Sequence, residues 1–167
     1  MKEYNSVSEP FLADVRAVVG DANVFTEPEK LEQYKTDEEY DPRRFRVPEA
    51  VVRPANAEEI AAVVKLCNKY NVPLTVRSGG TSLADGAIAV CGGIVLLMER
   101  LNKIIEMNTE AMYVVAEAGV RTVDIQKMAN EAGYLYAGDP CSAESCLIGG
   151  NLATNAGGSK AVRYGVT

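Results

Sequence analysis

The stretch from Ala50 to Ala87 constrains the fold of this chain more than any other part of the sequence. An apolar run at residues 50–53 precedes Pro54 and Asn56, an asparagine that can cap a helix, with Glu59 placed to reach back toward the cap. A second apolar run follows at residues 73–77. The pattern predicts a strand–helix–strand unit whose second strand leads directly into a glycine-rich loop. The expected inner face of the helix contains Ile60, Val63, Val64, Cys67 and Tyr70, and Asn71 ends it.

The glycine-rich loop, hereafter the glycine loop, has features of a cradle for an anion. Glycine has no Cβ, so consecutive backbone N–H groups can turn toward one anion, and short hydroxyl side chains add donors at the same place. Charge-assisted hydrogen bonds contribute about 1.5 to 3 kcal/mol each, so three or four give roughly 5 to 10 kcal/mol, whereas micromolar affinity needs about 8. A second binding segment is therefore expected elsewhere. The loop has the sequence Val76-Arg77-Ser78-Gly79-Gly80-Thr81-Ser82-Leu83-Ala84-Asp85-Gly86-Ala87.

A second segment with glycine, amide and hydroxyl residues lies between Asp139 and Gly165. Tight turns beside a helix of small residues would give the same composition, and each glycine segment alone fits that explanation equally well. Two such segments, one of them following a strand, favour a nucleotide cofactor. Neither Gly-x-Gly-x-x-Gly nor the Walker pattern occurs, since the interval from Gly80 to Gly86 is one residue too long for the latter. The candidate residues in this segment are Gly149, Gly150, Asn151, Thr154, Asn155, Gly157 and Gly158, followed by Tyr164 and Gly165.

The remaining sequence predicts an α+β fold, because a helix does not follow every strand. Thr26 and Thr122 each occupy a position suited to a helix cap. The predicted elements are a helix from Ser8 to Gly20, an extended segment from Asn23 to Thr26, a short helix from Glu27 to about Tyr34, a surface loop over 35–46, a meander of three strands at 93–98, 103–107 and 112–116, and a helix from Thr122 to Ala132.

Composition excludes several classes of function. A net charge of −6 and clusters of basic residues no larger than the one at 43–46 argue against a nucleic-acid surface. The chain has no histidine, which excludes histidine-based triads, zinc sites and a histidyl-linked flavin from this segment. No apolar run is long enough for a membrane span, and the N-terminus lacks the core of a signal peptide, so a cytoplasmic protein is expected.

The four cysteines are expected to be free thiols. Cys67 lies on the apolar face of a predicted helix and is expected in the core. Cys141 and Cys146 form a weak candidate for metal ligation, because two cysteines without histidine or a second pair make a poor site, and no metal is predicted.

These motifs together resemble the FAD-binding domain of the p-cresol methylhydroxylase and vanillyl-alcohol oxidase superfamily. Within it, the sequence is most similar to the D subunit of glycolate oxidase and to FAD-linked D-lactate dehydrogenases. The resemblance implies an N-terminal helical lead-in over 1–47 and an FAD-binding domain over 48–167, incomplete at its C-terminus. The matching segments are Val52-Arg53-Pro54, the helix from Glu58 to Val72, Val76 to Ala87, Asp139-Pro140, Ile148 to Gly158 and Tyr164-Gly165-Val166-Thr167.

The resemblance also implies roles for both glycine segments. FAD would lie between two α+β subdomains with its pyrophosphate on residues 77–82, while Pro140 and Ser142 would approach the isoalloxazine ring. Family members with covalent flavin carry histidine where this chain has Thr81, so the FAD is expected to be noncovalent. The residues expected along the diphosphate and flavin are Gly150, Asn151, Thr154 and Asn155.

The family's reaction is oxidation of a 2-hydroxy acid to the 2-oxo acid by hydride transfer to flavin, with electrons passed to a protein or quinone acceptor. The substrate-binding cap would lie beyond Thr167, so these residues are expected to be a fragment, or one part of a site completed elsewhere, and inactive alone; no catalytic acid or base can be named. Two alternatives remain: a reductase like those acting on enolpyruvyl sugars, and a noncatalytic flavin-binding or electron-transfer module.

Two residues depart from the family pattern. Asp85 stands where many relatives have glycine, which places a carboxylate near the expected pyrophosphate unless the side chain turns outward. Leu147 stands where a hydroxyl residue is frequent.

Overall fold

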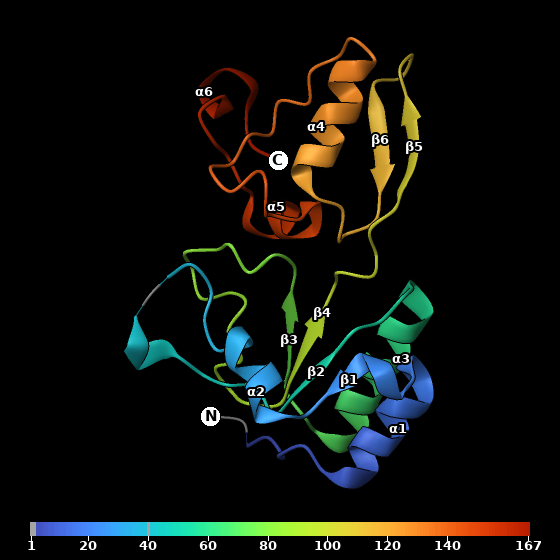
Figure 1. Cartoon of the computed structure of the whole chain (residues 1–167), viewed down its shortest axis with the longest axis vertical. Helices are drawn as coiled ribbons and strands as arrows, with labels where there is room; N and C mark the ends of the chain where they lie inside the picture. Colours follow the sequence, from blue (N-terminus) through green and yellow to red (C-terminus); the bar gives the residue numbers. More distant parts are fainter. Residues whose placement is uncertain (1–2, 40) are drawn as a thin grey trace. The chain divides into compact units, whose positions relative to one another are not determined.

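A computed structural model describes residues 3–39 and 41–167, and these residues form two compact units. Unit 1 contains the described residues up to 77 together with 82–100, and unit 2 contains 78–81 and 101–167 (Figure 1). Both units combine helices with strands, so the expected α+β class is confirmed.

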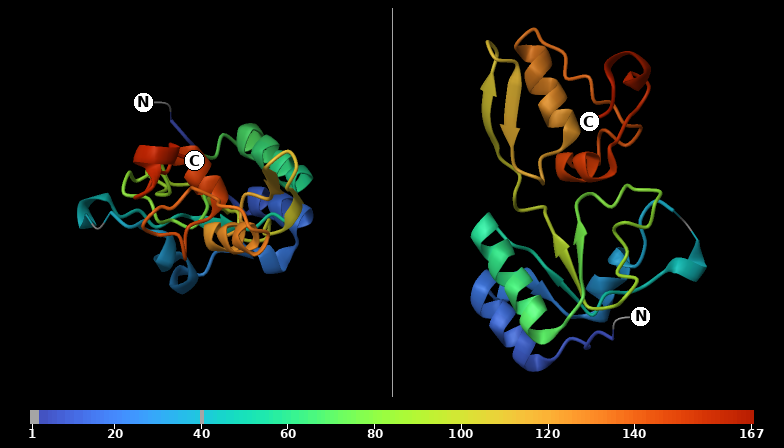
Figure 2. Two further views of the ribbon diagram at one scale, coloured as in Figure 1. Left: turned by 90° about the horizontal axis from the view of Figure 1, so that it is seen from above. Right: turned by 180° about the vertical axis from the view of Figure 1, so that it is seen from behind.

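Unit 1 is built on a four-stranded sheet in the order β1-β2-β4-β3. The first pair is antiparallel, whereas β2 and β3 both run parallel to β4. Helices α1 and α3 lie side by side in both views of Figure 2, and they pack together. The elements are α1 (Glu9–Val19), η1 (Asp21–Asn23), β1 (Val24–Phe25), α2 (Pro28–Leu31), η2 (Glu32–Tyr34), η3 (Pro42–Arg44), β2 (Ala50–Val52), α3 (Ala57–Tyr70), β3 (Leu74–Arg77) and β4 (Ile94–Leu97).

The predicted strand–helix–strand unit is confirmed, with one exception on the helix face. Asn56 Oδ1 accepts a hydrogen bond from Glu59 N at 2.8 Å, and Glu59 Oε2 accepts one from Ala55 N at 2.7 Å. Asn71 ends α3 with a left-handed backbone, φ +53°. Because β3 ends at Arg77 and runs parallel to β4, the glycine loop that follows it begins at the carboxyl end of these strands. Of the expected inner helix face, Val63 and Cys67 are buried, whereas Val64 is exposed.

The predicted meander over residues 93–116 is wrong, because β4 does not pair with the strand after it. Instead β4 lies between β2 and β3, and its four residues are all buried. A strand that is apolar at every position requires cover on both faces, which a central place in a parallel sheet provides. Val95 and Leu97 pack with Leu31 of α2 on one of these faces.

Unit 2 consists of an antiparallel hairpin covered by helices (Figure 1). Its core joins Val120, Ile125 of α4 and Ile148 of α5, against partly buried Ile104 and Val114 of the hairpin. The elements are β5 (Ile104–Asn108), β6 (Tyr113–Ala116), α4 (Thr122–Glu131), α5 (Ile148–Thr154) and α6 (Ala161–Tyr164).

Both predicted threonine caps are wrong. Helix α2 is capped at Glu27, because Pro28 takes the first helical position that its fixed φ favours. Helix α4 starts at Thr122, with Arg121 before it as the cap residue, and the Thr122 side chain is fully buried. The hydroxyl of Thr122 therefore serves the core of unit 2 instead of the helix end.

None of the helices within residues 3–39 and 41–167 combines the length and hydropathy of a membrane span.

Candidate cofactor site

The centre of the glycine loop has unpaired backbone donors. The N–H groups of Gly79, Gly80 and Thr81 donate no hydrogen bond to any described residue. Gly80 has φ +68°, a conformation that residues with a side chain rarely adopt. Three consecutive backbone donors are thus unpaired in a loop centre that is half-buried to exposed, and their contact with an anion stays a prediction.

The two glycine segments lie against each other inside unit 2. A Cβ on Gly79 would be 2.8 Å from the carbonyl oxygen of Ser145, and a Cβ on Gly150 would be 3.2 Å from Ser78 Cβ. Glycine at position 79 is therefore required by this close approach. The structure brings together the centre of the first segment and the start of the second.

Asn151, a predicted cofactor ligand, has its side-chain amide in the core of unit 2. Its side chain is buried, and Nδ2 donates to Thr122 Oγ1 at 2.6 Å. Thr122 Oγ1 lies 3.1 Å from Cys146 Sγ. The amide thus ties α5 to the start of α4. Contact between Asn151 and a cofactor stays a prediction.

Other predicted site residues lie at the two ends of α5. Thr154 Oγ1 donates to the carbonyl of Gly150 at 2.9 Å within the helix, and Asn155 ends the helix at φ +53° with an exposed side chain. A Cβ on Gly149 would lie 2.8 Å from both Cβ and the carbonyl oxygen of Ala118. Close packing of α5 against Ala118 therefore explains the glycine at 149.

The predicted residues before and after α5 lie mostly in irregular segments, except Tyr164, which ends α6. Pro140 and Ser142 are half-buried, and the Ser142 carbonyl accepts from Ser145 N and Cys146 N at 2.9 and 2.7 Å. A Cβ on Gly158 would lie 1.8 Å from the carbonyl oxygen of Asp139, which requires glycine there. Gly157 is half-buried, Tyr164 is exposed, and Gly165 has φ +87° in open space.

Arg77, predicted to face the anion, contacts residues of unit 1. The residue is 9% exposed, and Nη1 donates to the carbonyl of Thr36 at 2.7 Å. Its Cζ lies 5.7 Å from the centre of the Tyr34 ring. Burial lowers the pKa of Arg77, and the nearby carboxylate of Asp37 opposes that shift. Val76, in the same strand, has an exposed side chain, and Ser82 is half-buried.

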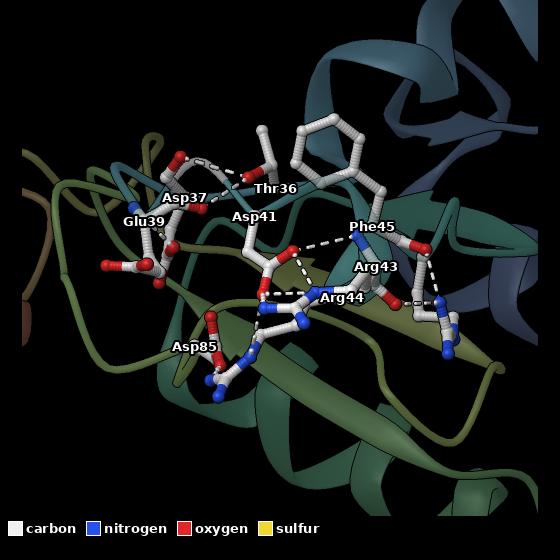
Figure 3. Close-up of polar contacts among 9 residues, drawn as sticks. Thr36, Asp37, Glu39, Asp41, Arg43, Arg44, Phe45 and Asp85 are labelled. Atoms are coloured by element: carbon white, nitrogen blue, oxygen red, sulfur yellow. Dashed lines mark hydrogen bonds and ion pairs between the residues drawn. The ribbon is translucent and has the colours of Figure 1, made fainter.

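Asp85 pairs with an arginine of the segment 35–46 (Figure 3). Asp85 Oδ2 accepts a hydrogen bond from Arg44 Nη1, and the two side chains are 16% and 58% exposed. Sequence reasoning placed Asp85 either beside the pyrophosphate or turned outward, and treated 35–46 as a surface loop without a role. A basic cluster at 43–46 together with an acidic residue in the glycine loop was the signal that could have suggested this pairing.

An apolar groove in unit 2 was not predicted from the sequence. It has a volume of about 460 Å³ and lies between the hairpin, α4 and α5. Met107, Met112 and Leu152 are among its lining residues. Its residues were predicted only as parts of separate strands and helices, so no local pattern marked the concavity.

None of the cysteines belongs to a group of side chains that could hold a metal ion within the described part of the chain. All four are free thiols; Cys67 and Cys146 are buried, and Cys91 and Cys141 are exposed. Among the described residues, no three acidic or cysteine side chains gather closely enough to hold a metal ion. The burial of Cys67 confirms its predicted place in the core.

Comparison with known proteins identifies a family and several relatives of this chain. A protein family described as "FAD binding domain" matches residues 48–167. The chain is 36% identical to the glycolate oxidase protein GlcD of Bacillus subtilis, with 75% of this chain and 27% of that protein aligned. It is 41% identical to D-lactate dehydrogenase of Anaerostipes hadrus (72% and 25% aligned). Identity to D-2-hydroxyglutarate dehydrogenase of Xanthomonas citri is 36% (96% and 34% aligned).

Solved structures share the fold. An alkyldihydroxyacetonephosphate synthase matches with a TM-score of 0.83 at 21% identity, covering 98% of this chain and 35% of that one. p-Cresol methylhydroxylase with substrate bound matches with a TM-score of 0.66 at 26% identity, covering 83% and 28%.

The chain spans about a quarter to a third of the length of the three relatives described above. The family match covers the strand–helix–strand unit, the glycine loop and all of unit 2. The chain therefore belongs to the FAD-binding domain family of oxidoreductases that includes the glycolate oxidase protein GlcD and D-lactate dehydrogenase, within the fold of p-cresol methylhydroxylase.

Proposed function

We propose that the chain is the FAD-binding part of an enzyme that oxidises a small 2-hydroxy acid to the 2-oxo acid. The observation that carries the proposal is the set of three consecutive unpaired amides at Gly79–Thr81, in a family whose relatives are named for glycolate, D-lactate and D-2-hydroxyglutarate. In this proposal the enzyme passes its electrons to a second protein or a quinone. We also propose that the enzyme is cytoplasmic.

The residues of the glycine loop fit a pyrophosphate group. The amides of Gly79, Gly80 and Thr81 and the hydroxyl of Thr81 provide donors, and the loop centre carries no acidic side chain. The negative charge of Asp85 is paired with Arg44. The second segment supports the loop through the contact between Gly150 and Ser78.

Bound FAD supplies the acceptor for the hydride that leaves the carbon bearing the hydroxyl group. This chain's contribution is to bind and orient the cofactor. Because Thr81 cannot form the histidyl link and the chain has no histidine, we propose that FAD is held noncovalently. We assign no residue of this chain as the acid or base that moves the substrate's hydroxyl proton.

The test is reconstitution of the full-length protein with FAD, followed by anaerobic addition of substrate. Glycolate, D-lactate or D-2-hydroxyglutarate is expected to bleach the visible flavin absorbance, and denaturation is expected to release all of the flavin. Reduction by NADPH and not by hydroxy acids would instead identify a reductase. Flavin uptake without reduction by either donor would identify a noncatalytic module.

A matched pair of variants tests the loop assignment. Gly80→Leu places a side chain in the anion cradle, whereas Gly133→Leu makes the same change in open space at a similar backbone conformation, φ +80° against +68°. Both variants place a side chain at a positive φ, so both apoproteins are expected to lose thermal stability. Only Gly80→Leu is expected to abolish FAD binding. Equal FAD affinity in the two variants would show that the loop does not contact the cofactor.

A further inference from the structure

Residues 36–38 hold both ends of the four-residue loop centre. On one side, Arg77 Nη1 donates to the carbonyl of Thr36 at 2.7 Å. On the other, the backbone N–H of Glu38 donates to the carbonyl of Ser82 at 3.1 Å. Only Ser78 to Thr81 lies between these two fixed points, and three of those residues carry the unpaired amides. A stretch of three residues thus fixes the entry and exit of the loop centre.

The first fixed point is rigid because it is buried. The Arg77 guanidinium is enclosed between the Thr36 carbonyl and the Tyr34 ring, and Asp37 beside it is 8% exposed. Asp37 Oδ1 in turn accepts from Glu39 N at 3.0 Å, which holds the turn that presents Glu38. Buried and mutually bonded groups have few alternative positions, so this end of the loop is held in place.

The third contact joins Arg44 to Asp85, which lies three residues after Ser82 (Figure 3). Asp85 has a left-handed backbone, φ +56°, that few residues other than glycine, asparagine and aspartate adopt readily. The other carboxylate oxygen, Oδ1, is buried and has no hydrogen-bond partner among the described residues. Arg44 therefore provides the charge that compensates this partly buried carboxylate, while its Nε lies 3.8 Å from Asp41 Oδ2.

We propose that Thr36, Glu38 and Arg44 form a clamp that sets the conformation of the glycine loop for its anionic ligand, and that Arg44 is a positioning residue acting through Asp85. The proposal rests on the proposed function, in which that ligand is the pyrophosphate of FAD. A loop fixed beforehand loses less conformational entropy when its ligand binds. Without Arg44, the partly buried carboxylate of Asp85 would be left without its counter-charge and would turn toward water, which displaces the chain that leaves the loop.

The chain offers a matched control for Arg44. Arg43 is the adjacent arginine, its side chain is 88% exposed, and it bonds to Asp41 and not to Asp85. In the full-length protein, Arg44→Gln is expected to weaken FAD binding about tenfold, or roughly 1.4 kcal/mol. Arg43→Gln is expected to leave the dissociation constant within about twofold, equivalent to roughly 0.4 kcal/mol. The measurement is quenching of flavin fluorescence in a titration of apoprotein.

A second pair of variants separates a positioning role from a general loss of stability. Asp85→Asn removes the charge and keeps a residue that tolerates the left-handed backbone. The double variant Arg44→Gln/Asp85→Asn is therefore expected to bind FAD better than Arg44→Gln alone, because no unpaired carboxylate remains. A double variant that binds as poorly as the single one would overturn the assigned role of Arg44.

Hydrogen exchange at residues 76–86 of the apoprotein tests the clamp without any cofactor. Faster exchange there in Arg44→Gln than in Arg43→Gln supports the clamp, even if the unaltered protein proves unable to bind FAD, a result that would refute only the proposed function. Equal exchange in the two variants overturns the clamp whether or not the protein binds FAD.

Discussion

Asn151 donates its side-chain amide to Thr122 Oγ1 over 2.6 Å, and both side chains are buried in unit 2. The bond joins the helix of the second glycine segment to the first turn of α4. We expect Asn151→Ala to lower the free energy of unfolding by about 2 kcal/mol, because it leaves a buried hydroxyl without its donor. Denaturant unfolding monitored by circular dichroism measures the change.

Thr154→Ala is the control for Asn151, since Thr154 bonds to Gly150 from an exposed position in the same helix. Its expected cost is below about 1 kcal/mol. If Asn151→Ala reduced FAD affinity while leaving the unfolding free energy unchanged, the residue would be a ligand and not a structural tie.

Gly158 has no room for a side chain beside Asp139. A Cβ would lie 1.8 Å from the Asp139 carbonyl oxygen, at a φ of +125°. Gly158→Ala is therefore expected to cost at least about 3 kcal/mol, from backbone strain and overlap together. Gly133→Ala, at a positive φ in open space, is expected to cost only about 1 kcal/mol. Similar melting temperatures for the two variants would contradict the close approach of these segments.

Burial raises the pKa of the Cys67 thiol to about 11 from 9.0. The native state thus favours the neutral thiol. The contribution of this group to the free energy of unfolding is complete below pH 9 and is lost as the pH rises toward 11. The loss amounts to roughly 3 kcal/mol at most, because each unit of pKa shift corresponds to about 1.4 kcal/mol. Urea unfolding across this pH range measures it, and Cys67→Ala should show a weaker alkaline loss.

Thiol labelling tests the same burial independently. At pH 8 a thiol-specific disulfide reagent is expected to modify the exposed Cys91 and Cys141 first, with Cys67 and Cys146 reacting only after unfolding. Rapid modification of all four thiols in the native protein would contradict the assigned core.

Asp139 has a lowered pKa, caused first by hydrogen bonding to Lys160 and next by Gln126. A lowered native pKa stabilises the fold above the unfolded value of 3.8, and this contribution disappears as the pH falls through the native pKa. Lys160→Gln is expected to move the Asp139 pKa upward. Carboxyl-carbon NMR titration of Asp139 follows it directly, and an unchanged titration would show that the pair does not form in solution.

Local sequence signals predicted the elements whose information is contained within a few residues. Asn56, Glu59 and Asn71 specify both ends of α3 through short-range hydrogen bonds and a left-handed residue, and the structure matches them. The two wrong caps have local causes as well. Pro28 shifted the start of α2, and burial of Thr122 diverted its hydroxyl to Asn151.

Long-range pairing could not be obtained in the same way. The apolar segment at 94–97 fits either a meander or a central parallel strand, because a run of apolar residues indicates a buried strand but does not determine which strand pairs with it. Likewise, Asp85 and Arg44 are 41 residues apart, and only the folded chain shows that they pair.

The sequence by itself determined the strand–helix–strand unit, the glycine loop and the family to which the chain belongs, since these depend on residue types at short, fixed spacings. The tertiary structure alone decided which polar groups of the candidate site remain unpaired. The side chains of Asn151 and Arg77 donate hydrogen bonds to other residues of the chain. The backbone N–H groups of residues 79–81 donate none to the described residues. The reason is physical: a hydrogen bond or an ion pair depends on distance in space, and burial sets its strength.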